Sequence, residues 1–141
     1  MRGGGVMRLV SKRRATTVLA AFSFVFAWTG ADAHHSFSAE FDIGQPIEIT
    51  GTVTAIEWTN PHAWVHMEVV DADGNATQWA VELLGVTALA RSGLTRQVLK
   101  PGDKITVNGY RARNGTPTAN ASTMKRADTG EHLWTSSVEP N

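Results

Sequence analysis

Three histidines are the residues of this chain best suited to bind a metal. If a signal peptidase cuts after Ala33, His34 gains a free α-amine, which titrates close enough to neutral for a metal to displace its proton. That amine and the imidazoles of His34 and His35 give up to three nitrogen donors, and His62 completes the set. Such donors suit copper in a flattened arrangement and zinc in a tetrahedral one. We therefore predict a copper or zinc site at His34, His35 and His62.

Each of these histidines also has a purely structural interpretation. His34 and His35 would form a solvated polar start to a loose arm, because chain ends are usually disordered. His62 follows Asn60-Pro61, a dipeptide that initiates turns. Its imidazole would then donate a hydrogen bond to a carbonyl and hold that turn. Both interpretations stay open at this stage.

Two tryptophans and a further histidine near the same turn predict a different kind of site. Trp58 and Trp64 flank the Asn-Pro turn, and His66 follows two residues later. If these rings are exposed at the mouth of a barrel, they can stack on a sugar or a peptide, or lie over a cation. The alternative function is therefore a small-ligand binder, or a peptide or protein adaptor, that uses Trp58, Trp64 and His66 without a metal.

Motifs for enzymatic chemistry are missing from the sequence. No Ser-His-Asp set and no glycine-rich phosphate loop can be identified, and Glu57 with Glu68 makes a weak carboxylate pair. Cysteine is absent, which excludes disulfides, thiolate metal sites and cysteine nucleophiles. We therefore expect a binding protein rather than an enzyme.

Residues 1–33 have the features of a signal peptide. Five basic residues precede an apolar stretch over 15–28, and Ala31-Asp32-Ala33 matches an A-x-A cleavage site. Arg13-Arg14 resembles a twin-arginine signal, but the residues that follow favour general secretion. The prediction is a periplasmic or secreted bacterial protein, cleaved after Ala33, with no transmembrane segment in its mature form.

The charge of the predicted mature chain bears on its partners. Residues 1–33 hold five of the 13 basic and one of the 13 acidic residues, which leaves 8 basic and 12 acidic residues, a formal net charge of −4. Binding to phosphate backbones relies on clustered Lys and Arg. We therefore expect no nucleic-acid partner.

The elements that would position these side chains are five strands and one short helix. The apolar positions of the first strand change phase near Gly51, which predicts a bulge. Three strands, a helix and two more strands, with a coiled first strand, are the order of the OB-fold, a small five-stranded barrel. A small open β-sandwich is the alternative. In chain order the predicted segments are a signal peptide (1–33), an N-terminal arm (34–46), strands over 47–58, 63–70 and 76–84, a helix over 86–92, strands over 104–111 and 119–126, and a frayed tail (136–141), the barrel domain as a whole spanning 47–135.

Several motifs together resemble one family of small exported bacterial proteins classed as a domain of unknown function. The resemblance covers nearly all of the predicted mature chain and implies export and a β-barrel, but no activity. His66 lies where relatives are expected to vary. The motifs are His34-His35-Ser36-Phe37, Glu40-Phe41-Asp42, Gly51-Thr52-Val53, the segment 57–64 (EWTNPHAW), Lys100-Pro101-Gly102-Asp103 and Gly109-Tyr110-Arg111-Ala112.

Overall fold

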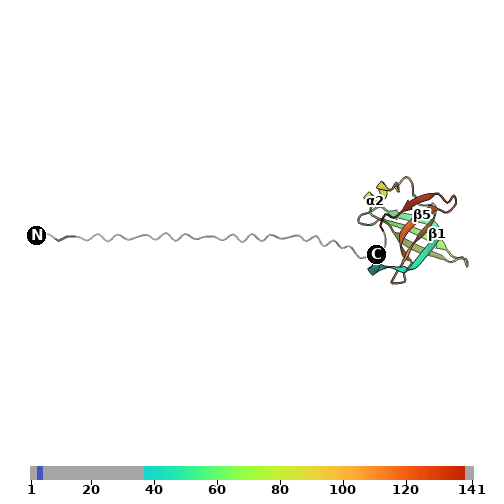
Figure 1. Ribbon diagram of the computed structural model, residues 1–141, viewed down its shortest axis with the longest axis horizontal. Coiled ribbons are helices and arrows are strands. Elements are labelled where there is room, and N and C mark those ends of the chain that lie inside the picture. The colour runs from blue at the N-terminus through green and yellow to red at the C-terminus, as the bar shows by residue number, and fades with distance from the viewer. Residues whose placement is uncertain (1–2, 5–36, 139–141) are drawn as a thin grey trace. The chain divides into compact units, whose positions relative to one another are not determined.

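The computed structural model describes residues 3–4 and 37–138. Within these residues the chain forms six strands and two short helices, and β1, β5 and α2 are labelled in Figure 1. In chain order the elements are α1 (Phe37–Glu40), β1 (Phe41–Glu57), β2 (Trp64–Val70), β3 (Ala76–Glu82), α2 (Val86–Arg91), β4 (Lys104–Ala112), β5 (Thr118–Arg126) and β6 (His132–Thr135).

Five of these strands close into a ring. The sheet has the order β3-β2-β1-β4-β5-β6, and a further pairing of β3 with β5 joins its two sides. The β3–β5 pair is parallel, whereas the other pairs are antiparallel. A five-stranded ring with a helix between its third and fourth strands is an OB-like barrel, which confirms the predicted all-β fold class. β6 is an addition to the ring along β5.

The interior of the barrel is built from alternating residues of its strands. Val65 and Met67 of β2 are fully buried, while Trp64 and His66 point to the other face, as the period-two pattern predicts. Val81 of β3 is also fully buried. Each such apolar side chain contributes roughly 1.5–3 kcal/mol when removed from water. Met67 is thus a core residue.

The first strand is longer than its sequence pattern predicts. It starts at Phe41 rather than Ile47, because Phe41 is buried and pairs with Ala112 of β4. The predicted bulge is present, since the β1–β2 register shifts between Val53 and Ala55. At Gly51 a Cβ would collide with the backbone carbonyl of Glu68. The coiled path of β1 therefore requires glycine there.

Several predicted segments lie wholly or partly outside the described residues. The predicted signal peptide falls in residues that are not described, apart from Gly3 and Gly4. Of the predicted arm, residues 37–46 form α1 and the start of β1, and of the predicted tail residues 136–138 are described. Among residues 3–4 and 37–138, no helix is long and apolar enough to cross a membrane.

Candidate functional site

The turn between β1 and β2 is tied to the end of β3 by backbone hydrogen bonds. The amide of Ala63 donates to the carbonyl of Leu84 at 3.2 Å, and the amide of Leu83 donates to the carbonyl of Ala63 at 2.9 Å. Inside the turn, Thr59 Oγ1 donates to the carbonyl of His62 at 2.8 Å. The Asn60-Pro61 peptide is cis. These contacts fix the backbone on both sides of His62.

Asn60 connects the same turn to the start of α2. Its Oδ1 accepts a hydrogen bond from the amide of Val86, the first residue of the helix, at 3.0 Å. The preceding residue is Gly85, where a Cβ would lie 2.6 Å from the Pro61 carbonyl oxygen and 2.7 Å from Asn60 Oδ1. Because only glycine leaves room for this approach, the turn and the helix form one packed unit.

His62 is held through one ring nitrogen. Its Nδ1 lies 3.1 Å from the carbonyl oxygen of Leu83 and 3.1 Å from Oε1 of Glu82. A carbonyl oxygen can only accept, so Nδ1 carries a proton, and in the neutral imidazole Nε2 then presents a lone pair. The side chain is 47% exposed, and no partner of Nε2 occurs among the described residues. The expectation that His62 donates to a carbonyl is confirmed, and the other nitrogen remains able to bind a ligand.

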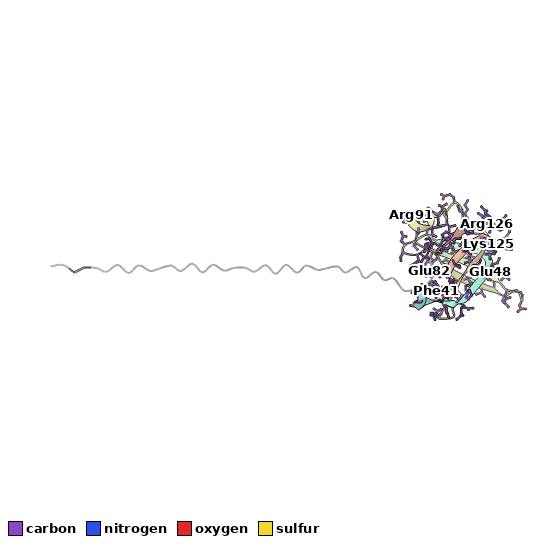
Figure 2. All side chains as sticks on the ribbon, in the orientation of Figure 1. Phe41, Glu48, Glu82, Arg91, Lys125 and Arg126 are labelled. Carbon is purple, nitrogen blue, oxygen red and sulfur yellow. The ribbon has the colours of Figure 1, made fainter. Side chains whose placement is uncertain are left out.

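The carboxylate behind His62 is buried. The Glu82 side chain, labelled in Figure 2, is only 8% exposed, although the alternation of β3 puts it on the face opposite Val81. It lies in a row of paired residues that crosses four strands, because Glu82 pairs with Trp64 of β2 and Asn120 of β5, and Asn120 pairs with Tyr110 of β4. A carboxylate that orients the imidazole through Nδ1 while Nε2 faces outward is the common supporting arrangement of metal-binding histidines.

Sequence reasoning missed Glu82. The alternation of β3 puts Trp79, Val81 and Leu83 toward the core, which predicts that Glu82 faces solvent. The outer face is covered at this point, so Glu82 is buried instead. The strand pattern alone holds no signal for that cover. Its position opposite Trp64 depends on the β2–β3 register, which only the fold reveals.

The other two residues predicted for the metal site, His34 and His35, lie outside the described residues. The next described residue after them is Phe37. Its ring centroid lies 5.6 Å from the ring centroids of both Phe41 and Tyr110. Among residues 3–4 and 37–138, no three His, Cys, Asp or Glu side chains gather closely enough to hold a metal.

The three residues predicted to bind a ligand have different surroundings. Trp58 is half-buried against the core, and the guanidinium carbon of Arg96 lies 5.6 Å from its ring centroid. Trp64 and His66 point outward from β2, where Trp64 lines a cleft. His66 Nε2 lies 2.7 Å from Oε1 of Glu57. Trp58 thus packs on the core beside Arg96, whereas Trp64 lines a cleft.

Fold and sequence together place the chain in a class and then in a family. The strand order and its closure define a small OB-like barrel. The chain belongs to a family of unknown function (DUF6152), whose profile matches residues 23–121. This confirms the resemblance to a family classed as a domain of unknown function. No curated protein matches the chain in sequence.

Solved structures share part of this architecture. A chain of the S. pombe Stn1–Ten1 complex is 17% identical at a TM-score of 0.43, over 58% of this chain and 57% of that one. A small single-stranded DNA-binding protein from Streptomyces coelicolor is 19% identical at 0.42, over 57% and 89%. The mitochondrial single-stranded DNA-binding protein Rim1 from S. cerevisiae is 9% identical at 0.43, over 59% and 93%.

The exclusion of a nucleic-acid partner from net charge was wrong. Two of the similar structures are single-stranded DNA-binding proteins. Net charge sums over all side chains, whereas contact with a single strand depends on local groups of cationic and aromatic residues. A cationic and an aromatic side chain lie together here despite the acidic excess of the predicted mature chain, since Arg111 lies 5.4 Å from the ring centroid of Trp79. Similarity at this level assigns no partner to the chain.

Proposed function

We propose that the chain is an exported periplasmic module that binds copper or zinc through the mature N-terminus and the Asn-Pro-His turn. The observation that carries this proposal is the state of His62. Its Nδ1 is held by the Leu83 carbonyl and the buried Glu82 carboxylate, the side chain is 47% exposed, and Nε2 has no partner among the described residues. An imidazole with this support is already oriented and in the tautomer that a metal needs. His34 and His35 would supply the remaining donors.

The length of chain before Phe37 supports the convergence of these donors. Phe37 lies against Tyr110, and Tyr110 is two strands away from Glu82 along the paired row. Two strand spacings amount to roughly 10 Å. His34 precedes Phe37 by three positions, and an extended chain spans up to about 10 Å over three residue steps. The α-amine and imidazole of His34 are therefore within reach of the outward nitrogen of His62.

The test uses the chain expressed with its own leader in a bacterial host. The exported protein is purified, and mass spectrometry determines whether it begins at His34. Titration calorimetry with Cu(II) and with Zn(II) is expected to give a sub-micromolar dissociation constant for one of them. A version with one extra glycine before His34 displaces the α-amine from its donor position and should bind more weakly.

Matched histidine variants identify the ligands. His62→Ala and His34→Ala should each weaken binding by at least about tenfold. His66→Ala is the control, because His66 is also half-exposed and paired with a glutamate, but it uses Nε2 for that pair. Circular dichroism establishes that each variant is folded. Metal affinity that is unchanged in His62→Ala would eliminate the proposal, as would a mature protein that starts elsewhere and lacks both terminal histidines.

A further inference from the structure

A cleft lies beside Trp64 on the outer surface of the barrel, apart from His62. Its volume is about 530 Å³, within the range of small-molecule sites. Residues of α1, the start of β2 and the turn after β4 surround it. The lining residues are Ala39, Glu40, Phe41, Trp64, Ala112, Arg113, Asn114 and Thr118.

The cleft is open because the small side chains of Ala112 and Thr118 lie next to the large side chain of Trp64. Ala112 ends β4 and Thr118 begins β5, so two short side chains lie at neighbouring strand ends. Thr118 also pairs with Ala80 of β3, which adds no bulk. Trp64, at the start of β2, supplies a half-buried indole to the wall. A flat ring entering the cleft can therefore contact the indole without displacing another side chain.

The polar rim of the cleft is held in place before any ligand arrives. Arg113 Nε donates to the carbonyl of Ser38 at 2.8 Å, and its backbone amide donates to the carbonyl of Glu40 at 2.9 Å. Its Nη2 lies 3.7 Å from Oδ1 of Asp42. Even so, the Arg113 side chain is 47% exposed. These contacts join α1 to the β4–β5 turn, so a ligand would meet a preformed rim rather than order it.

The chemistry of the lining selects the class of ligand. Among the described lining residues, one cationic and one anionic side chain, Arg113 and Glu40, leave no net formal charge. Arg113 offers donors only. Asn114 Oδ1 and Thr118 Oγ1 already accept hydrogen bonds from Thr116, so Asn114 offers its Nδ2 donors and the Thr118 hydroxyl can both donate and accept a second bond. Sugar hydroxyls both donate and accept, and the C–H face of a pyranose packs on an aromatic ring. We propose that this cleft binds a neutral oligosaccharide, with one sugar ring on Trp64 and its hydroxyls bonded to Arg113, Asn114 and Thr118.

The binding test uses the protein expressed with its own leader and purified after export, together with three neutral sugars as probes. The probes are cellotetraose, maltotetraose and chitotetraose. Titration calorimetry and intrinsic tryptophan fluorescence measure the binding of each. At least one should bind with a dissociation constant below about 1 mM. An eight-residue oligothymidylate is titrated in parallel and should not compete for the sugar site. Absence of binding by all three sugars, or displacement of the bound sugar by the oligonucleotide, would overturn the proposal.

Variants locate the sugar. Trp64→Ala should weaken binding at least about tenfold, whereas Trp64→Phe keeps an aromatic face and most of the affinity. Trp79→Phe is the control, because Trp79 packs with Arg111 and does not line the cleft. Thr118→Phe fills the hollow while Trp64 stays in place and should abolish binding, which covers the case that Trp64→Ala folds poorly. Sugar binding that survives both Trp64→Ala and Thr118→Phe would refute this site, whatever the outcome of the metal titrations.

Discussion

The two histidine–glutamate pairs of this protein differ in which partner is buried. In the His62–Glu82 pair the carboxylate is 8% exposed and the imidazole 47%, and the contact is made by Nδ1. In the His66–Glu57 pair the carboxylate is 58% exposed and the imidazole 34%, and the contact is made by Nε2 at the shorter distance of 2.7 Å. A short distance alone therefore does not identify the pair that can support a ligand.

Burial explains the difference. Water competes for both members of the exposed pair, and such pairs contribute about 0–1 kcal/mol. Glu82 instead has little contact with water, so its carboxylate depends on protein partners such as His62. The buried Glu82 carboxylate holds the His62 ring in one orientation, whereas the exposed Glu57 carboxylate is free to move together with His66. The predictions below test this contrast.

The largest effect on stability is expected for Gly85→Ala, which disturbs the packing of the turn that carries His62 against α2. The new methyl group would press on the Pro61 carbonyl and Asn60 Oδ1. Overpacking of this kind costs about 1–3 kcal/mol, and urea denaturation measures it as a lower midpoint. Thr87→Ala, at an exposed position of α2, should stay within about 0.5 kcal/mol. Equal stability of the Gly85→Ala variant and the wild type would show that the turn and helix are not packed as described.

Glu82→Gln tests whether the negative charge of Glu82, and not only its hydrogen bond to the His62 ring, supports metal binding. The amide can still accept from His62 Nδ1, but it lacks the negative charge that strengthens the nitrogen opposite. If the proposed metal site is correct, affinity falls about 10- to 100-fold in calorimetry. Glu57→Gln should leave the affinity within about twofold, because Glu57 contacts only His66 Nε2 among the described residues. Equal losses in both variants would mean that burial does not distinguish the two pairs.

Glu57→Ala tests directly how much the exposed His66–Glu57 pair contributes to stability. Removing this carboxylate should change the free energy of unfolding by no more than about 0.5 kcal/mol, with little dependence on salt, since the pair is solvated. Urea denaturation at low and high ionic strength provides the measurement. A loss above about 1 kcal/mol at low salt would place the His66–Glu57 pair among the structural contacts.

Asp71 extends the contrast to an exposed carboxylate with no histidine beside it. Hydrogen bonds from the side chain and then the backbone amide of Asn75 hold the pKa of Asp71 below its usual range. A lowered pKa in the folded state adds stability at neutral pH, and protonation removes that stability as the pH falls below about 4. The gap in melting temperature between wild type and Asp71→Ala should therefore be small at pH 7 and shrink at pH 3. Asp73→Ala, in the same turn, is the control; a gap that widens in acid would contradict the assignment.

Much of the barrel was predictable because its signals are local. The alternation of Val65 and Met67 and the phase change in the first strand each depend on a few neighbouring residues. The start of β1 was predicted six residues late because Phe41 is anchored by Ala112, a distant partner. The exclusion of nucleic acid failed for a related reason, since net charge ignores where charges lie.

The sequence by itself determined the family, the order of the elements and the inward face of each strand, because side-chain periodicity and turn residues act over short distances. Only the tertiary structure decided that Glu82 is buried behind His62, that Arg96 covers Trp58, and that Trp64 borders a cleft. These facts depend on the register of paired strands and on the closure of β3 against β5, which join residues about 40 positions apart. Periodicity carries no information about such pairings, so the chemistry of the surface became visible only in the folded chain.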